Sequence, residues 1–139
     1  MTERRLAILV TGGRAWTAQE PICRAIADLT AERLLENVWL IHGGARGADT
    51  IAGEAALRAG INVLPMPIPD AKWKRLGGAA GKLRNRLMVL VLRCLRWCGY
   101  ESVVLAFPDE ESRGTWHCVG VAKRAGFEVT VIKSDWVPR

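Results

Sequence analysis

The chain has 139 residues, half of them hydrophobic, and its 20 lysines and arginines outnumber its 14 acids to give a formal net charge of +6. This length and composition exclude a disordered chain and suit a single domain, residues 1–139, whose core needs no disulfide. The longest apolar run has six residues, far short of the roughly 20 of a membrane span, and no signal peptide is visible, so we expect a cytoplasmic protein with no membrane partner.

Short β-type runs alternate with longer helical runs along the chain. Strands are expected over residues 5–10, 38–41, 61–64, 102–107 and 128–132. Helices are expected from a capping box at Thr17–Glu20 to about Glu36 and over residues 48–59, 81–97 and 115–125, with residues 70–80 as a loop. Because this alternation is typical of βαβ units, we predict a Rossmann-like α/β fold: a doubly wound, five-stranded parallel sheet with helices on both faces.

Glycine and arginine gather at the points where the expected strands end. Thr11-Gly-Gly-Arg14 follows the first strand, His42-Gly-Gly-Ala-Arg-Gly-Ala-Asp49 the second, and Ser112-Arg-Gly-Thr115 the fourth. In doubly wound sheets, ligands bind outside the carboxyl ends of the strands. Glycine lets the backbone approach a ligand closely, and helix N-termini favour anions. The sequence therefore predicts a phosphate-bearing ligand, a nucleotide or a nucleotide derivative.

The basic excess lies in one segment, because residues 71–100 carry eight bases and no acid. Such a segment indicates an anionic partner, either a phosphate-bearing small molecule or a nucleic acid. The alternative is a helix face that is simply solvated.

Metal and P-loop chemistry find no support in the sequence. The four cysteines and two histidines lack the paired spacing of a zinc site, so we expect no metal, no cofactor, and buried, reduced thiols. Gly81-Lys82 is followed by Leu83, where a P-loop requires serine or threonine.

The ordered set of motifs resembles the SLOG superfamily, and within it the small YspA-like, YpsA-related domains. The motifs that carry this resemblance span most of the chain: Thr11–Arg14, Trp16, His42–Asp49, Trp73, Ala80-Gly81, Arg84-Asn85-Arg86, Met88 and Ser112–Thr115. The resemblance implies a nucleotide or nucleotide-derived ligand at the ends of the strands, held by a sensor or sequestering domain.

Two more distant resemblances supply alternative functions. LOG-type phosphoribohydrolases use an Arg–Glu pair; Arg84 matches the arginine, but Trp116-His117-Cys118 follows Gly114-Thr115 with no glutamate. An enzyme of this kind therefore needs another carboxylate, for which Asp109, Glu110 and Glu111 are the candidates, although a solvated acidic loop is the favoured explanation of these three residues. DprA-type proteins, which bind single-stranded DNA, have elements similar to residues 45–49 and 84–86, and Trp73 and Trp97 then become stacking surfaces.

The candidate ligand-binding residues are Thr11, Gly12, Gly13, Arg14, Gly43, Gly44, Arg46, Gly47, Asp49, Trp73, Arg84, Asn85, Ser112, Gly114 and Thr115. Arg14, Arg46 and Arg84 are expected to converge on one ligand, with Arg84 and Arg86 in the first turn of their helix. Asp49 either caps its helix or binds a ribose hydroxyl. Trp73 is either a lid over a base or a core residue.

The run Leu87–Leu92 is apolar on every side of its expected helix. A helix that is apolar all round is buried in a large core or pairs with another subunit. In a domain of this size we expect self-association, with a homodimer as the simplest closed form.

Overall fold

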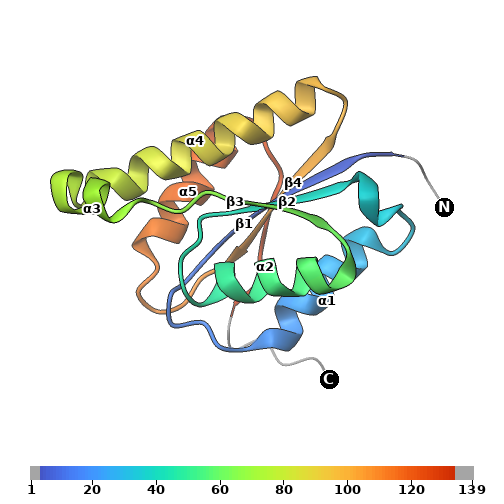
Figure 1. The fold of residues 1–139 in the computed structure, drawn as a ribbon, viewed down its shortest axis with the longest axis horizontal. Helices are drawn as coiled ribbons and strands as arrows, with labels where there is room; N and C mark the ends of the chain where they lie inside the picture. Colours follow the sequence, from blue (N-terminus) through green and yellow to red (C-terminus); the bar gives the residue numbers. More distant parts are fainter. Residues whose placement is uncertain (1–3, 134–139) are drawn as a thin grey trace.

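The computed structural model describes residues 4–133 (Figure 1); residues 1–3 and 134–139 of the expected single domain lie outside the described part. Five strands form one parallel sheet in the order β3-β2-β1-β4-β5. They are β1 (Leu6–Gly12), β2 (Val38–His42), β3 (Asn62–Pro65), β4 (Glu101–Phe107) and β5 (Val129–Val131). The strand order and directions confirm the predicted doubly wound sheet.

Two helical layers cover the sheet (Figure 1). The helices are α1 (Gln19–Thr30), α2 (Ala48–Ala59), α3 (Asp70–Leu76), α4 (Gly78–Trp97) and α5 (Arg113–Arg124), with a short 3₁₀ turn η1 (Leu35–Asn37). Helices α1 and α2 lie on one face, and α4 and α5 on the other. The central strands β1 and β2 and most of β4 are thereby buried, as expected for a parallel sheet, whereas the edge strands β3 and β5 are only partly buried.

Alternation along β1 assigns its side chains to the two layers. Leu6, Ile8 and Val10 pack towards α1 and α2, whereas Ala7 and Leu9 pack towards α4 and α5. All five are buried, which explains why β1 reads as a continuous apolar run rather than an alternating one.

Two expected element boundaries are wrong. The capping box does not form, because α1 begins at Gln19 after Ala18 and no side chain caps it. Tertiary packing sets this start instead: the buried Trp16 ring meets Phe107 edge to face, and its indole N–H donates to the Ala18 carbonyl at 2.6 Å. The helix also ends at Thr30 rather than near Glu36.

The expected loop over residues 70–80 is mostly helical. Residues 70–76 form α3, which ends at Gly77 with φ +56°, and α4 then begins at Gly78. The prolines before Asp70 and the glycines at 77, 78 and 81 favour a loop, and they outweighed the helix-forming residues 70–76 in the sequence-based prediction. Arg84 consequently lies at the end of the second turn of α4 and Arg86 in the third, not in the first turn.

The expectation of buried thiols is only partly correct. Cys118 is buried on α5, but Cys94 and Cys98 are exposed on the outer side of α4 and at its end, and all four cysteines are free. Among residues 4–133, no group of three or more histidine, cysteine or acidic side chains could hold a metal ion. No helix in the same range is both long and apolar enough to cross a membrane.

Candidate functional site

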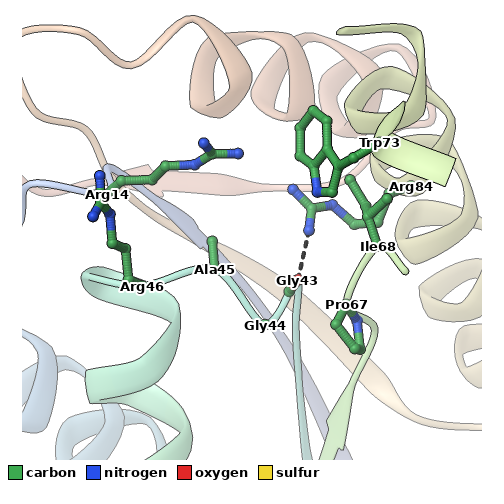
Figure 2. Close-up of a pocket in the computed structure, with 9 residues that line it drawn as sticks. All are labelled: Arg14, Gly43, Gly44, Ala45, Arg46, Pro67, Ile68, Trp73 and Arg84. Atoms are coloured by element: carbon green, nitrogen blue, oxygen red, sulfur yellow. Dashed lines mark hydrogen bonds between the residues drawn. The ribbon is translucent and has the colours of Figure 1, made fainter. Parts of the chain in front are cut away.

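A cavity of about 510 Å³ opens where β1, β2 and β3 end (Figure 2). Its walls come from the segment after each of these strands and from α3 and α4. The lining residues are Arg14, Gly43, Gly44, Ala45, Arg46, Pro67, Ile68, Trp73 and Arg84. Three arginines that lie far apart in the sequence therefore line one cavity, as the topology of a doubly wound sheet requires.

The floor of the cavity is the turn Gly43–Arg46, and buried side chains hold it from below. Asp49 Oδ2 accepts hydrogen bonds from the Gly43 and Ala45 amides at 3.0 and 3.3 Å, and His42 Nδ1 accepts from the Gly44 amide at 3.0 Å. The Gly13 amide is also paired, with the Phe107 carbonyl at 3.0 Å. These four amides are thus occupied within the protein, contrary to the expectation that the glycine-rich loops offer them to the ligand.

Side chains are consequently the main donors that face the cavity. Arg84 reaches in from α4 and donates to the Gly43 carbonyl at 2.6 Å and to Asn85 Oδ1 at 3.2 Å. Figure 2 shows its remaining terminal nitrogen pointing into the open space beneath Trp73. Burial lowers the pKa of Arg84, while the charge of Asp49 raises it.

Gly43 is required by the closeness of Arg84. A Cβ at this position would collide with the Arg84 guanidinium and come within 3.0 Å of the Asp49 carboxylate. Any larger residue would displace the arginine or break the turn, so the glycine is needed for space and not for an unusual backbone angle.

Asp49 lies behind the cavity wall rather than on its surface. Helix α2 begins at Ala48 after Gly47, so Asp49 is inside the first turn and does not act as the N-cap. Its Oδ1 is buried and has no hydrogen-bond partner among the described residues, and burial raises the pKa of Asp49 to about 6, against the lowering effects of the Ala45 amide and the Arg84 charge. Asp49 therefore positions the Gly43–Ala45 backbone.

His42 has the same positioning role, although its residue type alone did not indicate one. Burial, and then the charge of Arg84, lower the pKa of His42, which keeps the ring neutral and able to accept from Gly44. Its buried position one residue before the glycine pair was the available signal. Pro67 and Ile68 were missed as lining residues because the prolines after β3 indicate only extended backbone.

Arg14 and Trp73 form the upper wall of the cavity. The Arg14 guanidinium lies 5.3 Å from the centre of the Trp73 ring, so a residue after β1 meets a residue of α3. Trp73 is partly exposed and lines the cavity, which favours the lid over the core. Arg46 is exposed on the opposite side of the opening from Trp73 (Figure 2).

The remaining candidates lie outside the cavity lining and stabilise its surroundings. Ser112 Oγ donates to Asp109 Oδ1 at 2.8 Å, and Asp109 Oδ2 accepts from the Ala15 amide at 2.9 Å. Asn85 Nδ2 donates to the Gly114 carbonyl at 3.1 Å. The other candidates that do not line the cavity are Thr11, Gly12, Gly13, Gly47, Asp49 and Thr115.

Asp109 is the one acid of its loop that is held in place. Burial raises its pKa, but hydrogen bonds from Ser112, Ala15 and Glu111 outweigh that effect and lower it. The bond from the Ala15 amide ties the loop after β4 to the loop after β1, whereas the bonds from Glu111 and Ser112 order the loop itself. Among the described residues, no aspartate or glutamate lines the cavity.

Comparisons with known proteins identify the family and the fold. A family model, YAcAr (YspA, cpYpsA-related SLOG family), matches residues 6–75. The Gene 61 protein of Mycobacterium phage D29 is 38% identical over 125 residues, which is 88% of this chain and 92% of that protein.

Two solved structures share the fold. DNA processing protein A (DprA) from Streptococcus pneumoniae superimposes with a TM-score of 0.52 and 18% identity, over 91% of this chain and 58% of that one. DNA processing protein A from Helicobacter pylori, whose structure concerns its binding of single-stranded DNA, gives a TM-score of 0.60 and 19% identity, over 92% and 65%. The chain thus spans about three fifths of the length of both structures.

Proposed function

We infer the function of this chain on the premise that it belongs to the YspA, cpYpsA-related SLOG family. We propose that it binds a nucleotide or nucleotide derivative through phosphate, in the cavity at the ends of β1, β2 and β3. Its role is to hold this ligand, as a sensor or sequestering domain, rather than to transform it.

One observation carries the proposal. Arg14, Arg46 and Arg84 come from three separate segments and line one cavity that no carboxylate shares, among the described residues. Like charges gathered in this way repel one another unless an anion lies between them. An arginine guanidinium also matches the geometry of a phosphate with two parallel hydrogen bonds.

The other wall suits the remainder of a nucleotide. Trp73, Pro67 and Ile68 offer apolar surface next to the arginines, and a base stacks on an indole ring. The proposed arrangement places phosphate towards Arg84 and Arg46 and the base towards Trp73.

Titration calorimetry with nucleoside mono-, di- and triphosphates tests this arrangement, starting from whatever nucleotide mass spectrometry finds in the purified protein. Arg84→Ala should weaken binding by about 1.5–3 kcal/mol, or roughly tenfold to more than a hundredfold, and Arg84→Lys should recover part of the loss. Because Arg84 also holds the Gly43 turn, the exposed Arg46 supplies a second variant. Arg46→Ala should weaken binding with no change in melting temperature.

The matched control is Arg58→Ala. Arg58 is an exposed arginine near the C-terminal end of α2 and does not line this cavity. The substitution should leave the affinity unchanged. If wild type, Arg46→Ala and Arg84→Ala bind the nucleotide equally well, the ligand does not bind in this cavity.

Single-stranded nucleic acid is the second candidate ligand, favoured by the charge of the α4 and α5 layer. That layer carries eight bases and no acid: Lys82, Arg84, Arg86, Arg93, Arg96, Arg113, Lys123 and Arg124. The Helicobacter pylori protein that shares the fold binds single-stranded DNA. In this case the cavity holds one nucleotide of a strand whose other phosphates lie on the basic layer.

Salt dependence separates the two candidates. Binding of a free nucleotide depends modestly on salt, whereas each phosphate neutralised along a single strand adds about 0.7 to the slope of log K against log salt. If an oligothymidylate binds no more tightly than a mononucleotide, and log K falls no more steeply with log salt, single-stranded nucleic acid is excluded as the ligand.

Turnover is not expected. Cleavage of an N-glycosidic bond needs a carboxylate near the sugar, and Asp109 is instead bonded to Ser112 and Ala15 outside the cavity lining. Incubation with nucleoside monophosphates should release no free base. Release at about 1 per second or faster would assign the phosphoribohydrolase function instead.

A further inference from the structure

The outer side of α4 is apolar and uncovered. Of the run Leu87–Leu92, which the sequence predicted to be apolar all round, Met88, Val89 and Leu92 are buried against the sheet, whereas Leu87 and Leu90 are 40% and 51% exposed. Figure 1 shows α4 as the long helix at the edge of the molecule, with no other element on its outer side.

The exposed apolar residues continue along the whole helix at regular spacing. We call them the α4 seam: Leu83, Leu87, Leu90, Cys94 and Trp97. Successive members are four and three residues apart, which is the spacing of a helix that packs against a second helix. A solvated face has no need of this pattern, and Trp97, 81% exposed, is the most exposed large apolar residue described.

The seam is complementary to itself when a second copy is turned end for end. With Leu90 on a two-fold axis, Leu83 meets Trp97 of the second copy and Leu87 meets Cys94. Leu90 then meets its own copy, while the large Trp97 faces the smaller Leu83, and a closed two-fold contact results.

The exposed area is of the right size for such a contact. The seam exposes roughly 400 Å² of apolar side chain, comparable with the largest, often functional, patches on soluble monomers. Two copies would bury roughly 800 Å² through the seam alone, so the side chains that flank it must supply the rest of the roughly 1,200–2,000 Å² of a stable interface.

The rim of the seam is entirely basic. Arg86 and Arg93 flank it, and neither α4 nor α5 contains an acid. In the two-fold pairing Arg86 lies near the second copy's Arg93, so the charges oppose association while the apolar seam favours it. Salt screens exposed charges, and a dimer of this kind is therefore strengthened by added salt.

We propose that α4 is a homodimer interface in which two copies pack antiparallel through the α4 seam, centred on Leu90. The dimer would leave both cavities open, because Arg84 faces the cavity and not the seam. The inference is independent of the proposed ligand.

Light scattering on the full chain gives the first test. Wild type should be a dimer at tens of micromolar, as an order of magnitude, and Leu90→Glu should raise the dissociation constant roughly 100-fold by placing an unpaired charge in the contact. Leu57→Glu is the matched control, since Leu57 is 66% exposed on α2, on the opposite layer. Circular dichroism should show all three proteins folded.

Cysteine cross-linking tests the orientation in a Cys94→Ala, Cys98→Ser background. Leu90→Cys should cross-link to itself, whereas Leu83→Cys should do so only when mixed with Trp97→Cys. Self-linking by Leu83→Cys alone would mean parallel packing and overturn the antiparallel arrangement.

Two further results would overturn the interface itself. One is a wild-type monomer at these concentrations. The other is a dimer that Leu90→Glu leaves intact or that added salt dissociates, since such a dimer uses another, charge-complementary surface.

Discussion

The two helical layers of this protein bury the same sheet but differ in the charge and in the amount of apolar surface that they expose. The layer of α1 and α2 carries both charges, with four acids and two bases: Glu20, Asp28, Asp49, Glu54, Arg24 and Arg58. The layer of α4 and α5 carries bases alone, together with most of the exposed large apolar side chains. Folding requires only the buried faces, so the exposed faces are where the proposed ligand, strand and dimer contacts can be tested.

Substitutions on the buried faces of the two layers should lower the stability of the protein most, and they test whether both layers contribute equally to it. Ile22 on α1 and Leu92 on α4 are both fully buried. Ile22→Ala and Leu92→Ala should each lower the free energy of unfolding by about 2–5 kcal/mol, measured by urea denaturation. Two similar losses would confirm that the layers contribute alike to stability; a small loss at Leu92 would mean that α4 is held mainly by its partner.

The pH dependence of stability tests a feature that only the α1 and α2 layer has, namely the buried acid Asp49. Burial raises the pKa of Asp49 from 3.8 to about 6, so between these values the folded protein holds a proton that the unfolded chain has lost. The contribution of Asp49 to the free energy of unfolding should therefore fall by about 3 kcal/mol in total between about pH 3 and pH 7, with about 2 kcal/mol of that fall between pH 4 and 6, and stay constant above about pH 7.

Asp49→Asn removes this titration while keeping an oxygen for the Gly43 and Ala45 amides. As the pH rises from 4 to 6, the wild type should lose stability relative to the variant, so the unfolding free energy of the variant minus that of the wild type should increase. Glu54→Gln, at an exposed position of the same helix, is the control and should produce no such trend. A flat difference for Asp49→Asn would contradict the raised pKa.

The salt dependence of single-strand binding should change least, and it tests whether the bases of one exposed face contribute more than those of the other. A double variant of α5, Lys123→Ala with Arg124→Ala, should reduce the salt slope of oligothymidylate binding by up to about 1.4, because each phosphate that a base neutralises accounts for about 0.7 of the slope. The double variant Arg24→Ala with Arg58→Ala removes the same charge from the other layer and should leave the slope unchanged. Equal reductions would mean that net charge, and not the basic layer, attracts the strand.

Local patterns were sufficient for the fold and for the position of the candidate cavity. Helix α2 spans the expected residues 48–59, and Gly60 ends it with φ +89°, because apolar spacing and a glycine terminus are properties of neighbouring residues. Parallel strands bring their carboxyl ends to one edge of the sheet, so the alternation of strands and helices was enough to bring Arg14, Arg46 and Arg84 to one cavity.

Contacts between distant segments decided what the patterns left open. Trp16 against Phe107 set the start of α1, and Asp49 and His42 turned the amides of the glycine-rich turn away from the cavity. Packing of α4 on the sheet selected which side of Leu87–Leu92 is buried and which remains exposed. A residue's spacing within its own element determines which neighbours share its face, but hydrogen-bond direction and exposure depend on atoms that only the folded chain brings together.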